Sequence, residues 1–128
     1  MKPILELSNI NRSFGAINAL RNVTFAIYPG EVMGLVGENG AGKSTLVKII
    51  SGFDSGFSGS IKLSGKDVRF TSPGKAEKSG IAIAQQELSL IPTMSVAENI
   101  FLAGESAPIF ATKKTLAMKA SKYLDEVG

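Results

Sequence analysis

The first thirty residues of the chain show the alternation of apolar and polar positions that is typical of β-strands. Leu5 and Leu7 alternate with polar neighbours, and Val23, Phe25 and Ile27 repeat the pattern further along. Since successive side chains of a strand point to opposite faces, each stretch predicts a strand with one buried face.

A continuously apolar run at 32–36 follows a Pro-Gly turn signal at 29–30. The lack of polar alternation in this run predicts a strand that is buried on both faces. A glycine-rich loop from Gly37 to Gly42 comes next, and the apolar positions beyond it have the spacing of a helix. These positions are Leu46, Ile49, Ile50 and Phe53.

The middle of the chain predicts short elements. Two short stretches, 61–63 and 68–70, look like strands joined through a Ser-Gly pair and predict a small hairpin. A Ser-Pro pair at 72–73 predicts the N-terminus of a helix, and Gly80 predicts its end. The apolar run at 81–84 predicts a further buried strand.

The last third of the chain predicts two helices. Ser95 and Glu98 form an S-x-x-E capping box, which starts a helix that carries Val96, Ile100 and Phe101. An amphipathic helix then runs to the last residues, with its apolar face at Leu116, Ala120, Tyr123, Leu124 and Val127. Antiparallel hairpins combined with strand–loop–helix units predict an α/β fold over residues 1–128.

Composition narrows the chemistry that the chain can perform. Its 128 residues include no cysteine and no histidine, so disulfides, thiolate metal sites and imidazole bases are excluded. The net charge of +3 is scattered along the chain, which favours an ordinary solvated surface and no nucleic-acid partner. No run approaches the roughly 20 apolar residues of a membrane-spanning helix.

The glycine-rich loop matches the pattern G-x-x-x-x-G-K-[ST] in full. Its residues are Gly37, Glu38, Asn39, Gly40, Ala41, Gly42, Lys43, Ser44 and Thr45. Glycines let successive backbone N–H groups point inward at an anion, and the helix that follows adds the positive end of its dipole.

Two side chains complete this phosphate-binding loop. Lys43 supplies a cation for the β- and γ-phosphates, and the Ser44 hydroxyl can coordinate Mg²⁺. The alternative is a glycine-rich turn with a chance lysine. The predicted strand before the loop and the predicted helix after it favour nucleotide binding.

Two further segments resemble the ATPases of the ATP-binding-cassette (ABC) transporters. Residues 14–23, followed by 28–31, resemble their N-terminal antiparallel region, in which an aromatic residue stacks on adenine, and Phe14 matches that residue. The alternative is that Phe14 is a core aromatic. The stretch 85–102 resembles the family's Q-loop and the residues after it.

The resemblance assigns roles within the Q-loop. Gln86 matches the glutamine that senses the γ-phosphate and Mg²⁺ and couples the site to the transmembrane subunits, with Gln85 as the alternative. The implied ligands are therefore ATP and Mg²⁺, with Lys43 and Gln86 in catalytic roles and Ser44 and Gln86 at the metal.

Within the family, the sequences of 86–92 and 97–104 look most like those of bacterial importers of monosaccharides such as ribose, xylose or galactose. Importers of nucleosides share much of these sequences. The resemblance implies an ATP hydrolase that energises sugar uptake. Its implied partners are transmembrane permease subunits, a second cassette and, indirectly, a substrate-binding protein. Its implied place is the cytoplasmic, inner face of the cell membrane.

Three hallmarks of the family do not occur in this sequence: the L-S-G-G-Q signature, the Walker B strand that ends in Asp-Glu, and the switch histidine. We therefore expect 1–128 to be a partial nucleotide-binding domain with an incomplete central sheet. Alone, it is expected to lack ATPase activity, and either to self-associate or to pack its last helix, 116–127, differently from the intact cassette. The alternative function is a nucleotide-binding or regulatory module that never hydrolyses ATP.

Overall fold

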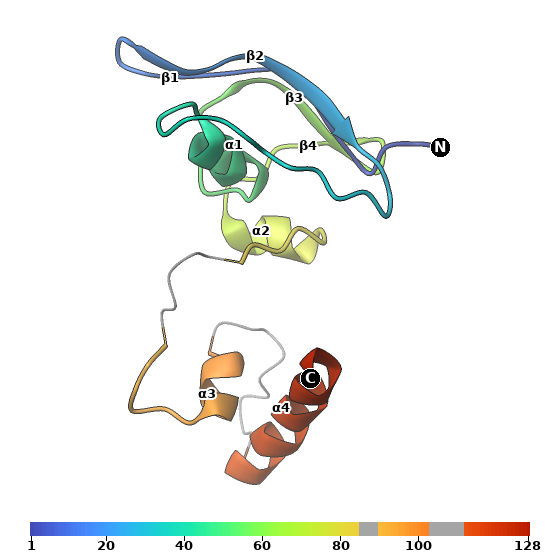
Figure 1. Cartoon of the computed structure of the whole chain (residues 1–128), viewed down its shortest axis with the longest axis vertical. Coiled ribbons are helices and arrows are strands. Elements are labelled where there is room, and N and C mark those ends of the chain that lie inside the picture. The colour runs from blue at the N-terminus through green and yellow to red at the C-terminus, as the bar shows by residue number, and fades with distance from the viewer. Residues whose placement is uncertain (85–89, 103–111) are drawn as a thin grey trace. The chain divides into compact units, whose positions relative to one another are not determined.

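The computed structural model describes residues 1–84, 90–102 and 112–128, and the chain divides into two compact units, Met1–Ala84 and Gln85–Gly128 (Figure 1). Gln85 and Gln86, the Q-loop candidates, lie outside the described residues. The first unit contains the glycine-rich loop, and the second contains the last two helices.

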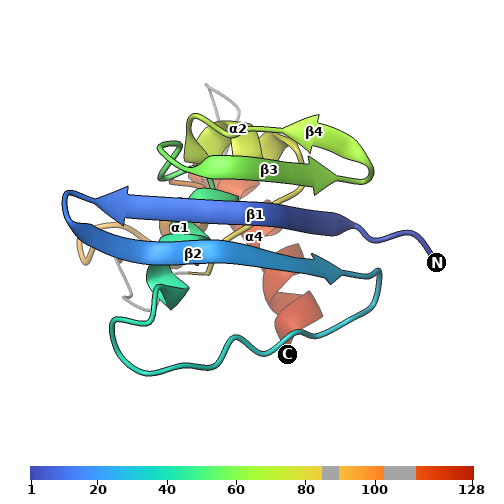
Figure 2. The same cartoon turned by 90° about the horizontal axis from the view of Figure 1, so that it is seen from above.

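The first unit is built on a four-stranded antiparallel sheet. Its strands are β1 (Leu5–Phe14), β2 (Ile17–Ile27), β3 (Ser58–Leu63) and β4 (Lys66–Val68), in the order β2-β1-β3-β4 (Figure 2). The two predicted N-terminal strands and the predicted hairpin are confirmed. Ser64 and Gly65 have φ angles of 50° and 78°, which form the tight turn that suits the twist of a hairpin. The fourth strand begins and ends two residues earlier than predicted.

A bulge in β1 keeps its apolar residues on the buried face. Leu7 is buried, and simple alternation would place Asn9 beside it. Asn9 instead adopts a φ of 53°, and the pairing with β2 shifts between Leu7 and Ile10. Ile10 is therefore fully buried, and the Asn9 N–H is satisfied by Thr24 Oγ1 at 2.9 Å.

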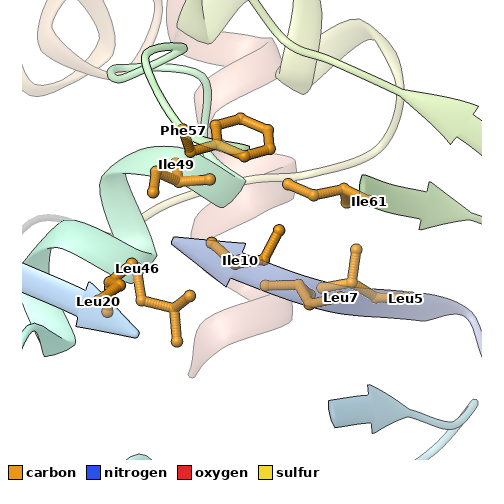
Figure 3. Packing of buried hydrophobic residues seen from close by; sticks show 8 residues of the cluster. All are labelled: Leu5, Leu7, Ile10, Leu20, Leu46, Ile49, Phe57 and Ile61. Atoms are coloured by element: carbon orange, nitrogen blue, oxygen red, sulfur yellow. The ribbon is translucent and has the colours of Figure 1, made fainter. Parts of the chain in front are cut away.

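The core of the unit lies between the sheet and helix α1 (Lys43–Ile50) (Figure 3). Its buried members are Leu5, Leu7, Ile10, Leu20, Leu46, Ile49, Phe57 and Ile61. The predicted helical spacing is confirmed for the side chains of α1 that reach this core. The helix ends three residues before Phe53, which is 52% exposed.

Helix α2 (Pro73–Lys78) has the predicted boundaries. Ser72 is its N-cap, Pro73 occupies the first turn, and Gly80 follows the end of the helix with a φ of 95°. The helix is anchored by one small side chain, since Ala76 is its buried residue.

Two predicted strands are wrong. Residues 32–36 and 81–84 form no regular secondary structure, and Val32 and Val36 are 97% and 94% exposed. A strand exists only when a neighbouring strand takes its backbone hydrogen bonds. Among the described residues neither run has such a neighbour in the sheet. The apolar residues of these runs favour burial, but the strands described in the sheet do not pair with them.

The second unit contains α3 (Val96–Ile100) and α4 (Lys113–Val127). The predicted capping box is confirmed, because Ser95 Oγ accepts from Glu98 N and Ser95 N donates to Glu98 Oε2 at 2.8 Å. Ser95 Oγ also donates to Glu98 Oε2 at 2.7 Å, and this hydrogen bond, together with the one from Ser95 N, holds the pKa of Glu98 below its usual value. Within the unit, Phe101 and Tyr123 meet edge to face with ring centroids 6.0 Å apart.

No described helix is long and apolar enough to cross a membrane. Asp125 and Glu126 lie on α4 and are exposed, so this acidic pair belongs to a solvated helix face.

Candidate functional site

The glycine-rich loop leads directly into helix α1. Ala41 N donates to Glu38 O at 3.1 Å, which closes a turn within the loop, and Gly40 and Gly42 have φ angles of 85° and 90°. The loop is open to solvent from Gly37 to Ala41. It therefore presents an accessible backbone curve in front of the helix.

The N-terminus of α1 keeps its backbone donors free for a ligand. Gly42 is the N-cap, so no side chain caps the helix, and its first turn carries no acidic residue. The first hydrogen bond of the helix runs from Leu46 N to Gly42 O at 2.9 Å. The N–H groups of Lys43, Ser44 and Thr45 precede it and have no partner within the helix. These donors and the helix dipole favour an anion at this end.

Lys43 directs its charge back into the loop. Its Nζ donates to Gly37 O at 2.5 Å and to Glu38 O at 2.7 Å. The ammonium thus lies on the concave side of the loop, held by two neutral carbonyl groups. A phosphate oxygen is a stronger acceptor for an ammonium than a carbonyl is, so Lys43 is available to exchange partners.

Gly42 fits against β2 with no room for a side chain. A Cβ atom built at Gly42 would lie 2.4 Å from Ala19 O and 2.8 Å from Leu20 Cδ2. This close approach fixes the N-terminus of α1 on strand β2. The glycine is therefore needed both for its left-handed φ and for its small size.

Phe14 lies at the end of β1, beside the two-residue turn to β2, and pairs with Ile17 across that turn. It is 49% exposed, so it is not a core aromatic. The guanidinium of Arg12 lies over its ring, with Cζ 4.3 Å from the ring centroid. The structure thus places an accessible aromatic ring on the hairpin, where the sequence resemblance expects one.

Arg12 is also held by two hydrogen-bond acceptors in the loop that follows α1. Its Nε donates to Asp54 Oδ2 at 2.8 Å, and one terminal nitrogen donates to Gly56 O at 2.7 Å. Partial burial raises the pKa of Asp54. The hydrogen bonds from Gly56 and Arg12, with the charges of Arg12 and Lys48, outweigh that effect, so the pKa lies below its ordinary value of 3.8.

Sequence reasoning did not identify Arg12 or Asp54. They are 42 positions apart, so no local pattern links them. One signal was available for Arg12: residues two apart in a strand lie on the same face, which puts Arg12 beside Phe14.

The structure brings together part of the predicted site. The phosphate loop, Lys43 and Ser44 share the start of α1, with Ser44 exposed in its first turn. No group of three acidic side chains that could hold a metal occurs in the described ranges. A cation at this loop would take the Ser44 hydroxyl and otherwise rely on phosphate oxygens and water, which suits Mg²⁺.

Comparisons with known proteins agree with this geometry. A family model described as "ABC transporter" matches residues 20–128. The ribose import ATP-binding protein RbsA of Caldanaerobacter subterraneus is 46% identical over 100% of this chain and 26% of that protein. The xylose/arabinose import ATP-binding protein XylG of Sulfolobus acidocaldarius is 44% identical over 99% of this chain and 51% of that protein.

A solved structure shows the same likeness in three dimensions. MJ1267, an ATP-binding cassette of an ABC transporter, superposes with a TM-score of 0.81 at 29% identity, over 98% of this chain and 54% of that one. The chain spans between about a quarter and about half of the length of these proteins.

Proposed function

Because the chain belongs to the ABC transporter family, as the match over residues 20–128 shows, we propose that it binds ATP and that the whole protein hydrolyses ATP to drive sugar import. The observation that carries the proposal is the glycine-rich loop that enters the uncapped N-terminus of α1 with Lys43 Nζ on its concave side. The predicted α/β fold and the family resemblance are confirmed by the comparisons.

In this proposal each end of the nucleotide has its own binding residues. The backbone of 37–45 and the N-terminus of α1 hold the phosphates, and Lys43 pairs with the β- and γ-phosphate oxygens. Ser44 would hold Mg²⁺, which supplies positive charge against the phosphates when bound. Phe14 stacks on the base, since every purine offers a flat apolar face to an exposed ring.

Gln86 is proposed as the residue that reports the γ-phosphate and Mg²⁺ to the rest of the transporter. It lies outside the described residues, and the support for its role is its place in the family resemblance.

The names of the relatives support a sugar as the cargo. The two proteins reported above are named for import of ribose and of xylose or arabinose, which supports a monosaccharide importer over a nucleoside importer. We propose transmembrane permease subunits and a second cassette as its direct partners. A substrate-binding protein takes part indirectly. The ATPase then works on the inner face of the membrane.

Titration calorimetry with ATP and Mg²⁺ tests the binding proposal on the 128-residue chain. Lys43→Ala removes a charge-assisted contact worth about 1.5–3 kcal/mol, so affinity is expected to fall by roughly 10- to 150-fold. Lys62→Ala is the matched control, because it removes the same charge from an exposed position in β3, away from the loop.

Equal affinities in Lys43→Ala and Lys62→Ala, with both variants folded, would refute the phosphate role of Lys43. The chain by itself is proposed to have no ATPase activity above background, because its sequence contains no signature motif and no Walker B carboxylate. Steady phosphate release that disappears in Lys43→Ala would contradict this part of the proposal.

A further inference from the structure

We propose that Arg12 is a positioning residue for nucleotide recognition: its anchored guanidinium covers one face of the Phe14 ring and holds the ring so that its other face is presented to the purine. The inference rests on the proposed stacking role of Phe14. It adds a residue that acts through Phe14 and does not itself contact the nucleotide.

The guanidinium is immobilised by contacts with the loop that follows α1. Asp54 and Gly56 O accept from different nitrogens of Arg12, and Asp54 Oδ1 in turn accepts from Gly56 N at 2.8 Å. The side chains of Arg12 and Asp54 are only 22% and 14% exposed. A planar fork bound at two of its nitrogens cannot rotate freely, so the plane offered to Phe14 is fixed.

The loop is shaped to admit this guanidinium. A Cβ atom at Gly56 would lie 2.7 Å from a terminal nitrogen of Arg12, so any larger residue would displace it. The close approach lets the Gly56 carbonyl accept a short hydrogen bond. The side chain of Arg12 is therefore held by the loop after α1, although the residue itself belongs to strand β1.

Phe14 gains its order from this contact. The ring lies beside a hairpin turn and is 49% exposed, so few apolar neighbours restrict its rotamers. A cation 4.3 Å from the centroid restricts the ring and leaves its exposed part for a ligand. A ring that is ordered before binding loses less conformational entropy when a base stacks on it.

The alternative arrangement places Arg12 on the ring face that the base would use, and it makes a different prediction. If Arg12 occupied the face that the base needs, it would compete with the nucleotide. The anchors argue against this, because Asp54 and Gly56 belong to the protein and hold Arg12 on the side of the ring that faces their loop. The charge of Arg12 is also compensated by Asp54, so it is a weak candidate for binding phosphate.

A second arginine provides a matched control. Arg69 lies over the ring of Phe57 with Cζ 4.2 Å from the centroid, and it donates to the backbone oxygens of Ser55 and Phe57. Arg69 thus binds the loop after α1 and covers an aromatic ring, as Arg12 does. The ring that it covers, Phe57, is buried, whereas Phe14 is exposed.

The test compares two ligands, ATP and inorganic tripolyphosphate, by calorimetry on the full chain. Arg12→Gln is expected to weaken ATP binding about three- to tenfold and to leave tripolyphosphate binding unchanged, because only ATP has a base to stack. Arg69→Gln is expected to change neither affinity. In the Phe14→Ala background, Arg12→Gln is expected to have no further effect.

The outcomes separate this inference from the proposed function. Equal weakening of both ligands by Arg12→Gln, or tighter ATP binding, overturns the positioning role. If Phe14→Ala weakens ATP binding while Arg12→Gln does not, only the positioning role fails. If Phe14→Ala leaves ATP binding unchanged, the stacking proposal fails and the inference with it. If Arg12→Gln does not fold, Arg12→Lys keeps the ion pair, loses the planar fork and gives the same comparison.

Discussion

Gly42 is the residue of the candidate site at which the surrounding backbone leaves no room for a side chain. It ends the phosphate loop, caps α1 and touches β2, so a single added methyl group tests all three features together. Two other glycines separate the causes. Gly34 has no atom within 4 Å of an added Cβ and no left-handed φ, and Gly40 has a φ of 85° but equally open surroundings.

The three alanine variants are expected to form a series in the free energy of unfolding. Gly34→Ala is expected to be neutral or slightly stabilising, because alanine restricts the unfolded chain. Gly40→Ala adds a left-handed alanine, which costs about 1–2 kcal/mol. Gly42→Ala adds the same strain and a Cβ 2.4 Å from Ala19 O, a close contact that adds about 1–3 kcal/mol, so its loss is roughly 2–5 kcal/mol.

Urea unfolding followed by circular dichroism measures the series, and calorimetry with ATP measures the site. Gly42→Ala is expected to lose ATP affinity as well as stability, because relieving the contact with Ala19 moves the start of α1. A Gly42→Ala variant no less stable than Gly40→Ala would show that the helix start is not fixed on β2. A neutral Gly40→Ala variant would show that the loop relaxes at no cost.

Three further predictions concern other parts of the chain. The pKa of Asp54 lies below 3.8 in the folded chain, so its carboxylate stabilises the fold at higher pH; the difference in unfolding free energy between the native chain and Asp54→Asn is expected to shrink as the pH falls below 3.8. In a reconstituted transporter, Gln86→Ala is expected to keep ATP affinity and lower the sugar transported per ATP hydrolysed; an unchanged ratio contradicts the coupling role. The 128-residue chain is expected to self-associate through its exposed apolar run at 32–36, and light scattering that reports a monomer at every dilution would exclude this.

Signals that depend on neighbouring residues predicted the local structure well. The Ser-Gly turn after Leu63, the Ser72 N-cap and the Ser95–Glu98 capping box all occur in the structure, because each is a contact within a few residues. The start of α1 followed from the same kind of reasoning, since the loop and the helical spacing adjoin each other. The candidate phosphate site is almost entirely local, so a sequence motif is enough to propose its residues.

Features that join distant segments were not predictable in the same way. The ion pair between Arg12 and Asp54 spans 42 positions, and the bulge at Asn9 depends on the register with β2. The sequence pattern around Asn9 departs from strict alternation by one residue, but it does not show whether the chain bulges there or ends its strand. Only the paired strand decides between the two.

The two failed strand predictions have one physical cause, and it bears on the site. Runs 32–36 and 81–84 are apolar throughout, and burying a side chain such as Val or Leu is worth about 1.5–3 kcal/mol. Among the described residues Val32 and Val36 are almost fully exposed, so this stabilisation by burial is not gained. These runs lead directly into the two segments proposed to contact the γ-phosphate, the loop from Gly37 and the pair at 85–86.

The halves of the proposed site therefore differ in how they are held. The hairpin with Phe14, the clamp by Arg12 and the start of α1 are fixed by contacts inside the first unit. The incoming side of the phosphate loop has no paired strand behind it among the described residues. We therefore expect this unit to bind the base and the helix-bound phosphates as it stands.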